Sequence, residues 1–215
     1  MVRDLGEAAL ETVFLVDDDP SVLRGLRRLL TAAGFEVAAF ESPREFLERH
    51  DALTPGCLVL DLAMPGVNGM QLQQELAARG SALPIVFLTG HGDVPTSVQA
   101  MKRGAADFLM KPVDEKDLLA AIRSAFEKGR AMRATRAETS EVERRIATLT
   151  PREREVLEHV VSGMRNKQVA GELGTVEKTV KVHRARVMEK MGARSLAELV
   201  RLAERGGIRG APDKN

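Results

Sequence analysis

The N-terminal half of the chain alternates short apolar runs with amphipathic segments. The five runs are rich in Val, Ile, Leu and Phe, as is typical of strands that are buried on both faces. Between the runs, apolar residues recur at helical spacing. The predicted strands are Val13–Val16, Val37–Phe40, Leu58–Leu60, Ile85–Leu88 and Phe108–Met110, and the predicted helices are Ser21–Ala33, Pro43–Glu48, Met70–Arg79, Val94–Arg103 and Asp117 to about Lys128.

This alternation predicts an α/β domain in which five parallel strands form one sheet with helices on both faces. In such sheets the functional residues collect at the carboxyl ends of the strands. The residues that directly follow each predicted strand are therefore where a functional site is expected.

A charged segment, residues 129–148, separates this domain from the rest of the chain. The segment is rich in arginine and glutamate, poor in aliphatic residues and free of proline. It is predicted to be a helical linker that continues the preceding helix, and its apolar positions are too sparse to indicate a coiled coil. The predicted domains are thus 12–128 and 149–208, joined by the linker 129–148.

The second domain is predicted to be all helical, because capping signals and helical spacing recur through it. Thr150–Glu153 and Ser195–Glu198 are capping boxes, and Asn166 is expected to cap a short helix. Gly174 then provides a tight turn, so two helices form a helix-turn-helix unit. The four predicted helices run from Pro151 to about Ser162, from Asn166 to near Leu173, over Glu177–Met191, and from Ser195 to about Arg205.

The composition agrees with two globular domains. The chain has 215 residues, of which 44% are hydrophobic and 29% charged. A single cysteine, Cys57, excludes an intrachain disulfide, and its apolar surroundings predict a buried side chain.

The N-terminal residues lack a signal-peptide pattern, and no run reaches the ~20 apolar residues of a membrane span. A cytoplasmic protein is expected.

The net charge of +1 hides an asymmetry between the two parts of the chain. Residues 1–128 carry 13 basic and 19 acidic side chains, a net charge of −6, whereas residues 129–215 carry 19 and 12, a net charge of +7. A basic C-terminal part indicates a polyanionic partner such as DNA. Two differently solvated surfaces would give the same counts, so charge alone does not decide.

Three carboxylates follow two of the predicted strands. Asp17 and Asp18 follow the first strand and Asp61 follows the third, and right-handed crossovers bring these strand ends side by side. Three adjacent carboxylates need a cation, and Mg²⁺ suits their oxygen ligands. Lys111 and Thr89, at two further strand ends, could stabilise a phosphoryl group transferred to Asp61. Each residue alone is more often a helix cap or a solvated side chain, so the prediction depends on their combination.

An aspartate nucleophile with Mg²⁺ also describes phosphatases of the haloacid dehalogenase type. Those enzymes need a second carboxylate two residues after the nucleophile as general acid and base. Here that position is Ala63. The chain is therefore expected not to be an enzyme.

Four motifs in this half resemble the receiver domains of two-component response regulators. They are V-D-D-D-P, V-L-D-L-A-M-P-G-V-N-G, T-G-H-G-D and K-P, and the resemblance runs from roughly Thr12 to Lys128. It implies a flavodoxin/CheY-like fold, phosphorylation of Asp61 by a sensor histidine kinase, and a cis peptide bond between Lys111 and Pro112.

The same resemblance implies roles for the neighbouring residues. The Mg²⁺ ligands would be Asp18, Asp61, the carbonyl of Ala63 and, through water, Asp17, whereas Asp19 would be spare. Thr89 and Lys111 would contact the phosphoryl group, and Phe108 would turn into the space that Thr89 leaves. The face around the helix Val94–Arg103 is where such receivers usually dimerise.

The longest helix predicted for the second domain has one apolar and one exposed face. Val180, Val187 and Met191 share the inward face of Glu177–Met191, and basic residues lie opposite. Such a helix fits the major groove of DNA. An exposed lysine is more often simply solvated, so this pattern alone does not establish DNA contact.

Two blocks in this domain resemble the LuxR/NarL-type helix-turn-helix domain over about Leu149 to Ile208. They are L-T-P-R-E-R-E-V-L-E-H-V-V-S-G-M-R-N-K-Q-V-A-G-E-L-G and T-V-K-V-H-R-A-R-V-M-E-K-M. The resemblance implies base contacts by Lys181, Val182 and Ala185 and phosphate contacts by Lys167, Lys178 and Arg186. The family usually has Ser or Thr directly before the recognition helix, where this chain has Val176. Either Thr175 caps a shifted helix, or the helix end frays.

Together the two resemblances identify the chain as a member of the FixJ/NarL family of response regulators. They imply a phosphorylation-dependent transcriptional regulator, more often an activator, whose partners are promoter DNA, a sensor histidine kinase, RNA polymerase and a second copy of the phosphorylated chain. A regulator that ignores phosphorylation is the weaker alternative, because the predicted pocket is complete.

Overall fold

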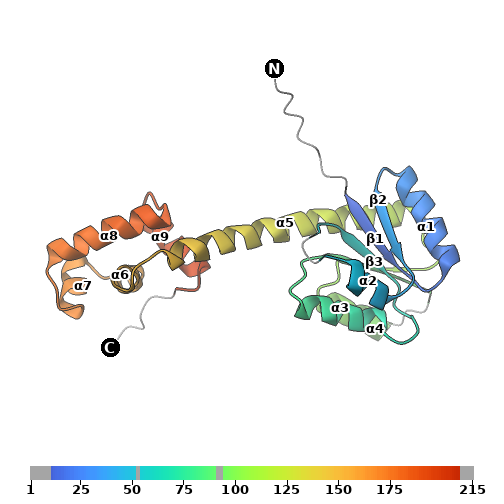
Figure 1. The fold of residues 1–215 in the computed structure, drawn as a ribbon, viewed down its shortest axis with the longest axis horizontal. Helices are drawn as coiled ribbons and strands as arrows, with labels where there is room; N and C mark the ends of the chain where they lie inside the picture. The colour runs from blue at the N-terminus through green and yellow to red at the C-terminus, as the bar shows by residue number, and fades with distance from the viewer. Residues whose placement is uncertain (1–10, 52–53, 91–93, 209–215) are drawn as a thin grey trace, which may run out of the picture. The chain divides into compact units, whose positions relative to one another are not determined.

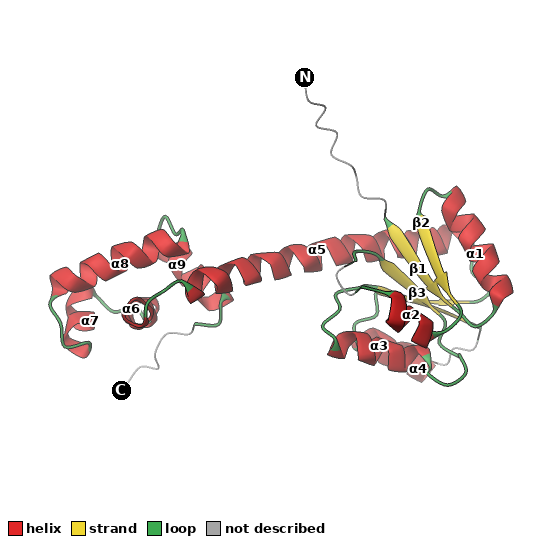
Figure 2. Ribbon diagram, viewed as in Figure 1, coloured by secondary structure: helices red, strands yellow, loops and turns green. Residues whose placement is uncertain are grey.

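Five parallel strands form the predicted sheet, in the order β2-β1-β3-β4-β5. This is the strand order of flavodoxin-like sheets, so the predicted fold class is confirmed. Figures 1 and 2 show β2, β1 and β3 as neighbours in the sheet. The computed structural model describes residues 11–51, 54–90 and 94–208, and the chain divides into two compact units, Met1–Arg133 and Ala134–Asn215. The strands are β1 (Thr12–Val16), β2 (Glu36–Phe40), β3 (Cys57–Leu60), β4 (Ile85–Thr89) and β5 (Asp107–Met110).

The helices of the first unit cover both faces of this sheet. Side chains alternate along β1, so that Val13 and Leu15 pack with α1 and α5, whereas Phe14 and Val16 pack with α2, α3 and α4. Both faces are apolar, which explains why the strands appear in the sequence as continuous apolar runs. The helices are α1 (Pro20–Ala32), α2 (Pro43–Arg49), α3 (Gly69–Ala78), α4 (Val94–Lys102) and α5 (Glu115–Ala147).

The helix α5 extends well beyond Lys128, where the last helix of the first domain was predicted to end. It runs for 33 residues without a break, so the charged segment 129–148 is helical as expected up to Ala147. Leu118 and Ile122 near its start are fully buried in the core of the first unit. Val142 and Ile146 near its end are buried in the core of the second unit, so the segment is more than a solvated spacer.

Four further helices complete the second unit around one apolar core. Val180, Val187 and Met191 are buried as predicted, and Gly174 adopts a φ of 60° in the turn before their helix. The helices are α6 (Pro151–Val161), α7 (Asn166–Glu172), α8 (Glu177–Met191) and α9 (Leu196–Arg205). Among the described residues, no helix combines the length and the apolar character needed to cross a membrane.

Two of the predicted capping arrangements are wrong in detail. Asn166 does not cap α7 but is its first residue, and the residue before it is Arg165, whose N–H donates to Gln168 Oε1 at 2.8 Å. The Asn166 side chain instead accepts from Arg184. The box that opens α9 is only half formed, because the Glu198 carboxylate accepts from the N–H of Arg194 and not from that of Ser195.

Glu153 is a buried charge that ties α6 to α8. Its carboxylate accepts from the N–H of Thr150 at 2.9 Å, which completes the predicted capping box, and from Lys190 Nζ at 2.6 Å. The side chain is only 3% exposed, and the Lys190 Nζ also donates to the carbonyl of Thr148. The Lys190 hydrogen bond, followed by that of Thr150, lowers the pKa of Glu153 to about 2.

Replacing Glu153 by Gln should destabilise the second unit. The amide can still accept from Thr150 but leaves Lys190 without its buried counter-charge, so the free energy of unfolding should fall by about 1–3 kcal/mol near pH 7. Because the folded pKa of Glu153 is depressed, its stabilising contribution is full above the unfolded value of about 4.5 and is lost as the pH falls toward 2. The difference between the wild type and the variant should therefore shrink in acid.

Urea unfolding followed through amide NMR signals of α6 and α8 measures this difference. The matched control is Glu158→Gln on the same helix, because Glu158 is 43% exposed and its ion pair with Arg154 lies at the surface. Equal stability of Glu153→Gln and the control at pH 7 would refute the role given to this pair.

Candidate functional site

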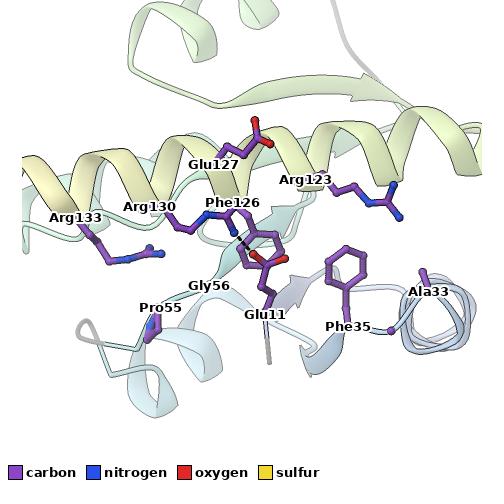
Figure 3. Close-up of a pocket in the computed structure, with 11 residues that line it drawn as sticks. Glu11, Ala33, Phe35, Pro55, Gly56, Arg123, Phe126, Glu127, Arg130 and Arg133 are labelled. Carbon is purple, nitrogen blue, oxygen red and sulfur yellow. Dashed lines mark hydrogen bonds and ion pairs between the residues drawn. The ribbon is translucent and has the colours of Figure 1, made fainter. Parts of the chain in front are cut away.

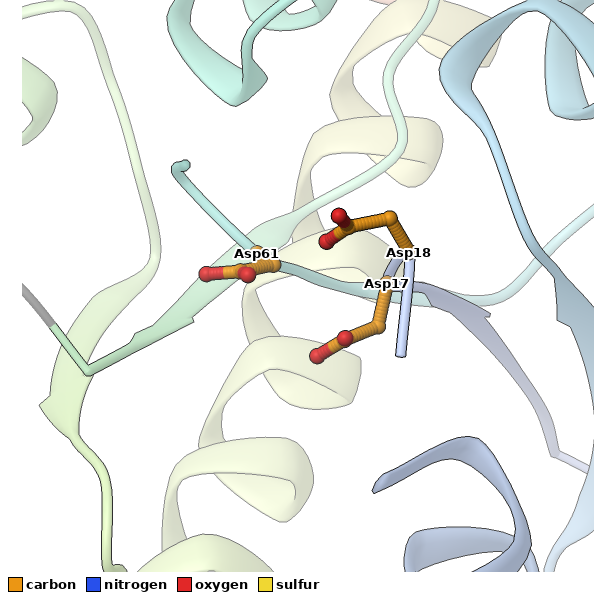
Figure 4. A group of neighbouring side chains, drawn as sticks. All are labelled: Asp17, Asp18 and Asp61. Carbon is orange, nitrogen blue, oxygen red and sulfur yellow. The ribbon is translucent and has the colours of Figure 1, made fainter. Parts of the chain in front are cut away.

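Asp17, Asp18 and Asp61 converge at the carboxyl edge of the sheet. The register pairs Val16 with Leu60, so the residues that follow β1 and β3 leave the sheet side by side. The N–H of Asp61 continues this pairing by donating to the carbonyl of Val16 at 2.9 Å. One carboxylate oxygen from each of the three residues lies within 4.8 Å of the others (Figure 4). The juxtaposition expected from the sequence is therefore present.

The three carboxylates differ in their exposure. Asp17 is 4% exposed and Asp61 is 9% exposed, whereas Asp18 lies at the surface. Backbone N–H groups partly compensate the buried charges, because Asp17 Oδ1 accepts from Asp19 at 2.9 Å and Asp61 Oδ1 accepts from Leu62 at 2.7 Å. One oxygen of each buried carboxylate is thus held by its own loop.

Lys111 provides the positive charge of the cluster. It follows β5, and its Nζ lies 2.5 Å from Asp17 Oδ2 and 3.5 Å from Asp61 Oδ2. Burial alone would lower the pKa of the Lys111 ammonium group, but the hydrogen bond and the charge of Asp17, together with Asp61, outweigh burial and raise it. Lys111 therefore stays charged and faces both buried carboxylates.

The cluster keeps an excess of negative charge. Three carboxylates and one ammonium group leave a formal charge of −2, and burial, offset in part by Lys111, raises the pKa of Asp17. A hard divalent cation takes carboxylate oxygens as ligands, and the cluster offers them from two loops, with the exposed Asp18 carboxylate on the solvent side. The arrangement therefore fits a divalent metal ion.

Gly69 allows α3 to begin directly against the loop that carries Asp61. A Cβ at this position would lie 2.4 Å from the carbonyl oxygen of Asp61, which no side chain tolerates. The N–H of Gly69 also donates to the carbonyl of Leu62 at 3.0 Å. The glycine of the V-N-G motif thus fixes the loop after β3.

The remaining receiver positions lie at neighbouring strand ends. Thr89 is the last residue of β4 and is fully buried, and its carbonyl accepts from the N–H of Lys111 at 2.8 Å. Phe108 on β5 is partly buried and contacts Phe87, with 6.1 Å between ring centroids. The peptide bond between Lys111 and Pro112 is cis, as the resemblance implied.

Other predicted positions fall outside the cluster or outside the described residues. Asp19 caps α1 by accepting from the N–H of Ser21 at 2.7 Å. Ala63 directly follows the Asp61 loop and is exposed. The residues 91–93 of the T-G-H-G-D motif lie outside the described residues.

A second candidate site is the exposed face of α8. All six positions proposed from the sequence are exposed, and Val182 has an exposed fraction of 46% although it is apolar. Lys181 pairs with Glu177 at 3.2 Å within the first turns of the helix, and this ion pair is open to solvent. The six positions are Lys167 on α7 and Lys178, Lys181, Val182, Ala185 and Arg186 on α8.

The start of α8 lies where the sequence placed it. The helix begins at Glu177, and Val176 occupies the cap position without a side-chain hydrogen bond. A shifted start with Thr175 as the cap is therefore excluded. Val176 is 65% exposed, so this uncapped end faces solvent.

One residue that orients α8 was missed from the sequence. Arg184 Nη1 donates to Asn166 Oδ1 at 3.1 Å and so joins α8 to the start of α7. The pair is separated by 18 residues, and neither helix spacing nor a motif links them. Only the position of Asn166 at a helix start marked it in the sequence.

Comparisons with known proteins identify two family domains in the chain. Residues 13–123 match the family described as response regulator receiver domain, and residues 147–203 match the family described as bacterial regulatory proteins, luxR family. Nodulation protein W of Bradyrhizobium diazoefficiens is 47% identical over 196 residues, which cover 91% of this chain and 86% of that protein. The transcriptional regulatory protein FixJ of Azorhizobium caulinodans is 47% identical over 203 residues, which cover 94% and 95%.

Solved structures give the same result. The response regulator StyR is 49% identical with a TM-score of 0.79, and the match covers 92% of this chain and all of that one. Full-length FixJ from B. japonicum is 43% identical with a TM-score of 0.56, and the match covers 92% and 97%. The chain belongs to the family of response regulators that join a receiver domain to a LuxR-type DNA-binding domain.

Proposed function

We propose that this response regulator binds promoter DNA when Asp61 is phosphorylated by a sensor histidine kinase. The observation that carries the proposal is the convergence of Asp17, Asp18 and Asp61 beside Lys111 at one edge of the sheet. Such a cluster can neutralise an incoming phosphoryl group only if a divalent cation joins it, and Mg²⁺ is the cation that suits carboxylates with retained waters.

Asp61 is the nucleophile of the proposed reaction. One of its carboxylate oxygens forms a bond to the phosphorus of a phosphohistidine, while the phosphorus–nitrogen bond breaks and its electron pair stays on the imidazole. Lys111 and the hydroxyl of Thr89 stabilise the equatorial phosphoryl oxygens. Asp18, Asp61, the Ala63 carbonyl and, through water, Asp17 would hold Mg²⁺, which would supply further charge stabilisation.

The proposed switch moves a signal from Asp61 to the β4–β5 side of the sheet. The phosphoryl oxygens of the phosphorylated Asp61 carry a charge of about −1.5 to −2, and this charge draws the Thr89 hydroxyl toward them. Phe108, which is only partly buried, then turns into the space beside β4. The altered face around α4 becomes the surface through which two phosphorylated copies dimerise.

The proposed DNA contacts lie on the exposed face of α8. Lys181, Val182 and Ala185 would reach base edges in the major groove, because Lys181 and Val182 lie in the N-terminal half of the helix and Ala185 lies close to its middle. Phosphate contacts would come from Lys167, Lys178 and Arg186.

The proposed domain limits are 12–128 for the receiver domain and 149–208 for the DNA-binding domain, with the linker 129–148 between them. The proposal places the protein in the cytoplasm and takes it to be an activator that contacts RNA polymerase at the promoter.

Phosphorylation should tighten DNA binding, and Asp61 should be required. With acetyl phosphate and Mg²⁺, the affinity for promoter DNA should rise by a factor of about 5–150, the usual range of coupling between sites. Asp61→Asn should abolish this rise and keep the basal affinity. Electrophoretic mobility shifts with and without phosphodonor measure both.

The matched control for this experiment is Asp19→Asn. Asp19 lies two residues from Asp17 but caps α1, and asparagine caps equally well, so the response should survive. Equal affinity of the wild type for DNA with and without phosphodonor would contradict the proposed switch.

DNA binding should depend steeply on salt. If each copy contacts three phosphates through Lys167, Lys178 and Arg186, a dimer should show a slope of about −5 in log affinity against log salt, from about −0.9 per contact. Lys178→Gln should make the salt dependence less steep for DNA of any sequence, because a phosphate contact is lost. Val182→Ala should keep the salt dependence of the wild type but reduce the preference for particular bases. Fluorescence anisotropy with labelled DNA measures the slopes, and a flat dependence in the wild type would contradict the assigned contacts.

No catalytic turnover of external phosphate esters is expected. The position two residues after Asp61 is Ala63, which cannot act as general acid or base for a leaving alcohol. Steady-state assays with p-nitrophenyl phosphate and Mg²⁺ should therefore show no multiple turnover. Sustained hydrolysis that Asp61→Asn removes would instead favour a phosphatase.

A further inference from the structure

The first unit contains a second pocket at the end of the sheet opposite the acidic cluster. Its volume is about 760 Å³, within the usual range of small-molecule sites. The residues directly before β1, β2 and β3 form one wall, and one face of α5 forms the other (Figure 3). No residue of this pocket belongs to the phosphorylation site proposed above.

The pocket combines an apolar wall with a row of cations. Phe35 and Phe126 stack in it with 5.8 Å between centroids and an interplanar angle of 10°, and Pro55 adds further apolar surface. Arg123, Arg130 and Arg133 project from α5 into the same space (Figure 3). Guanidinium groups donate hydrogen bonds, accept none and stack well on planar rings.

The charges of the pocket are only partly balanced within the described part of the chain. Arg130 pairs with the Glu11 carboxylate, which lies just before β1. Among the described residues, no ion pair within 4.0 Å involves Arg123 or Arg133, although Glu127 also lines the pocket. Glu11 thus already pairs with one arginine of the pocket, and the described residues leave the guanidinium groups of Arg123 and Arg133 without an ion-pair partner.

We propose that this pocket binds a small aromatic anion, a planar ring with a carboxylate or phosphate group. The ring would pack on the apolar wall at Phe35 and Pro55, and the anionic group would bind Arg133 and compete with Glu11 for Arg130. Arg123, about 15 Å from Arg133 along the helix axis, would take a second anionic group of a longer ligand.

Naphthoate and adenosine monophosphate are suitable probes, because naphthoate carries a carboxylate on a planar ring and the nucleotide joins a planar base to a phosphate through ribose. Binding of naphthoate can be followed by its own fluorescence, since the chain has no Trp and no Tyr. Calorimetry on the full-length protein measures binding of the nucleotide. We expect saturable binding of one molecule per chain for at least one probe, with a dissociation constant on the order of 1 mM or tighter.

Two substitutions should change the affinity in opposite directions. Arg133→Gln should weaken binding by about tenfold or more, because a charge-assisted hydrogen bond is lost. Glu11→Gln should tighten it, because the competing carboxylate is removed. The matched control is Arg24→Gln on the exposed face of α1, which should change nothing. Asp61→Asn should also bind the probe normally, so failure of the phosphorylation proposal would not affect this test.

Three results would overturn the proposal. The first is the absence of saturable binding for both probes. The second is equal binding by wild type and Arg133→Gln, which would place the probe elsewhere. The third is equal binding of naphthoate and the neutral naphthylmethanol, which would show that the pocket does not recognise an anion.

Discussion

The structure depends on holding two buried carboxylates side by side at the edge of a parallel sheet. Asp17 and Asp61 are forced together by the register of β1 and β3, and burial disfavours their charges. Lys111 reaches both of them from the end of β5 and so connects three strands through one ammonium group. The sheet order, the loop before α3 and the turn after β5 together place the two carboxylates and the ammonium group next to one another.

The balance is incomplete, and that is the basis of the proposed function. Four formal charges sum to −2, which a divalent cation neutralises, and conversion of the Asp61 carboxylate to an acyl phosphate then makes the site negative again. Thr89 and Phe108 lie on the neighbouring strands β4 and β5, where their side chains could respond to this change of charge.

The helix α5 gives each unit part of its core. Leu118 and Ile122 are buried with the sheet, and Val142 and Ile146 are buried with α6–α9. The sequence predicted a helix here but not its second apolar contact. Two aliphatic residues among many charges are too few to form a pattern, and only the fold of α9 and its neighbours gives them partners.

Much of the fold could be predicted because each element has a strong local signal. Buried strands, proline-led helix starts and the glycine turn before α8 are all visible in the sequence, and every observed strand lies within two residues of its predicted bounds. Long-range pairs were not predictable, because nothing local links Arg184 to Asn166 or Lys190 to Glu153. The cap at Asn166 was wrongly predicted for the same reason, since its side chain is engaged by Arg184. The arginine-lined pocket was missed because its walls come from three strand starts and a helix.

Mg²⁺ titration of the unphosphorylated protein by calorimetry tests the central electrostatic claim most directly. The account predicts one ion per chain, with binding at least about tenfold weaker in Asp18→Asn, which loses a charged ligand. Saturable binding that is unchanged in this variant, or no binding at all, would contradict the claim that the three carboxylates form a single cation site.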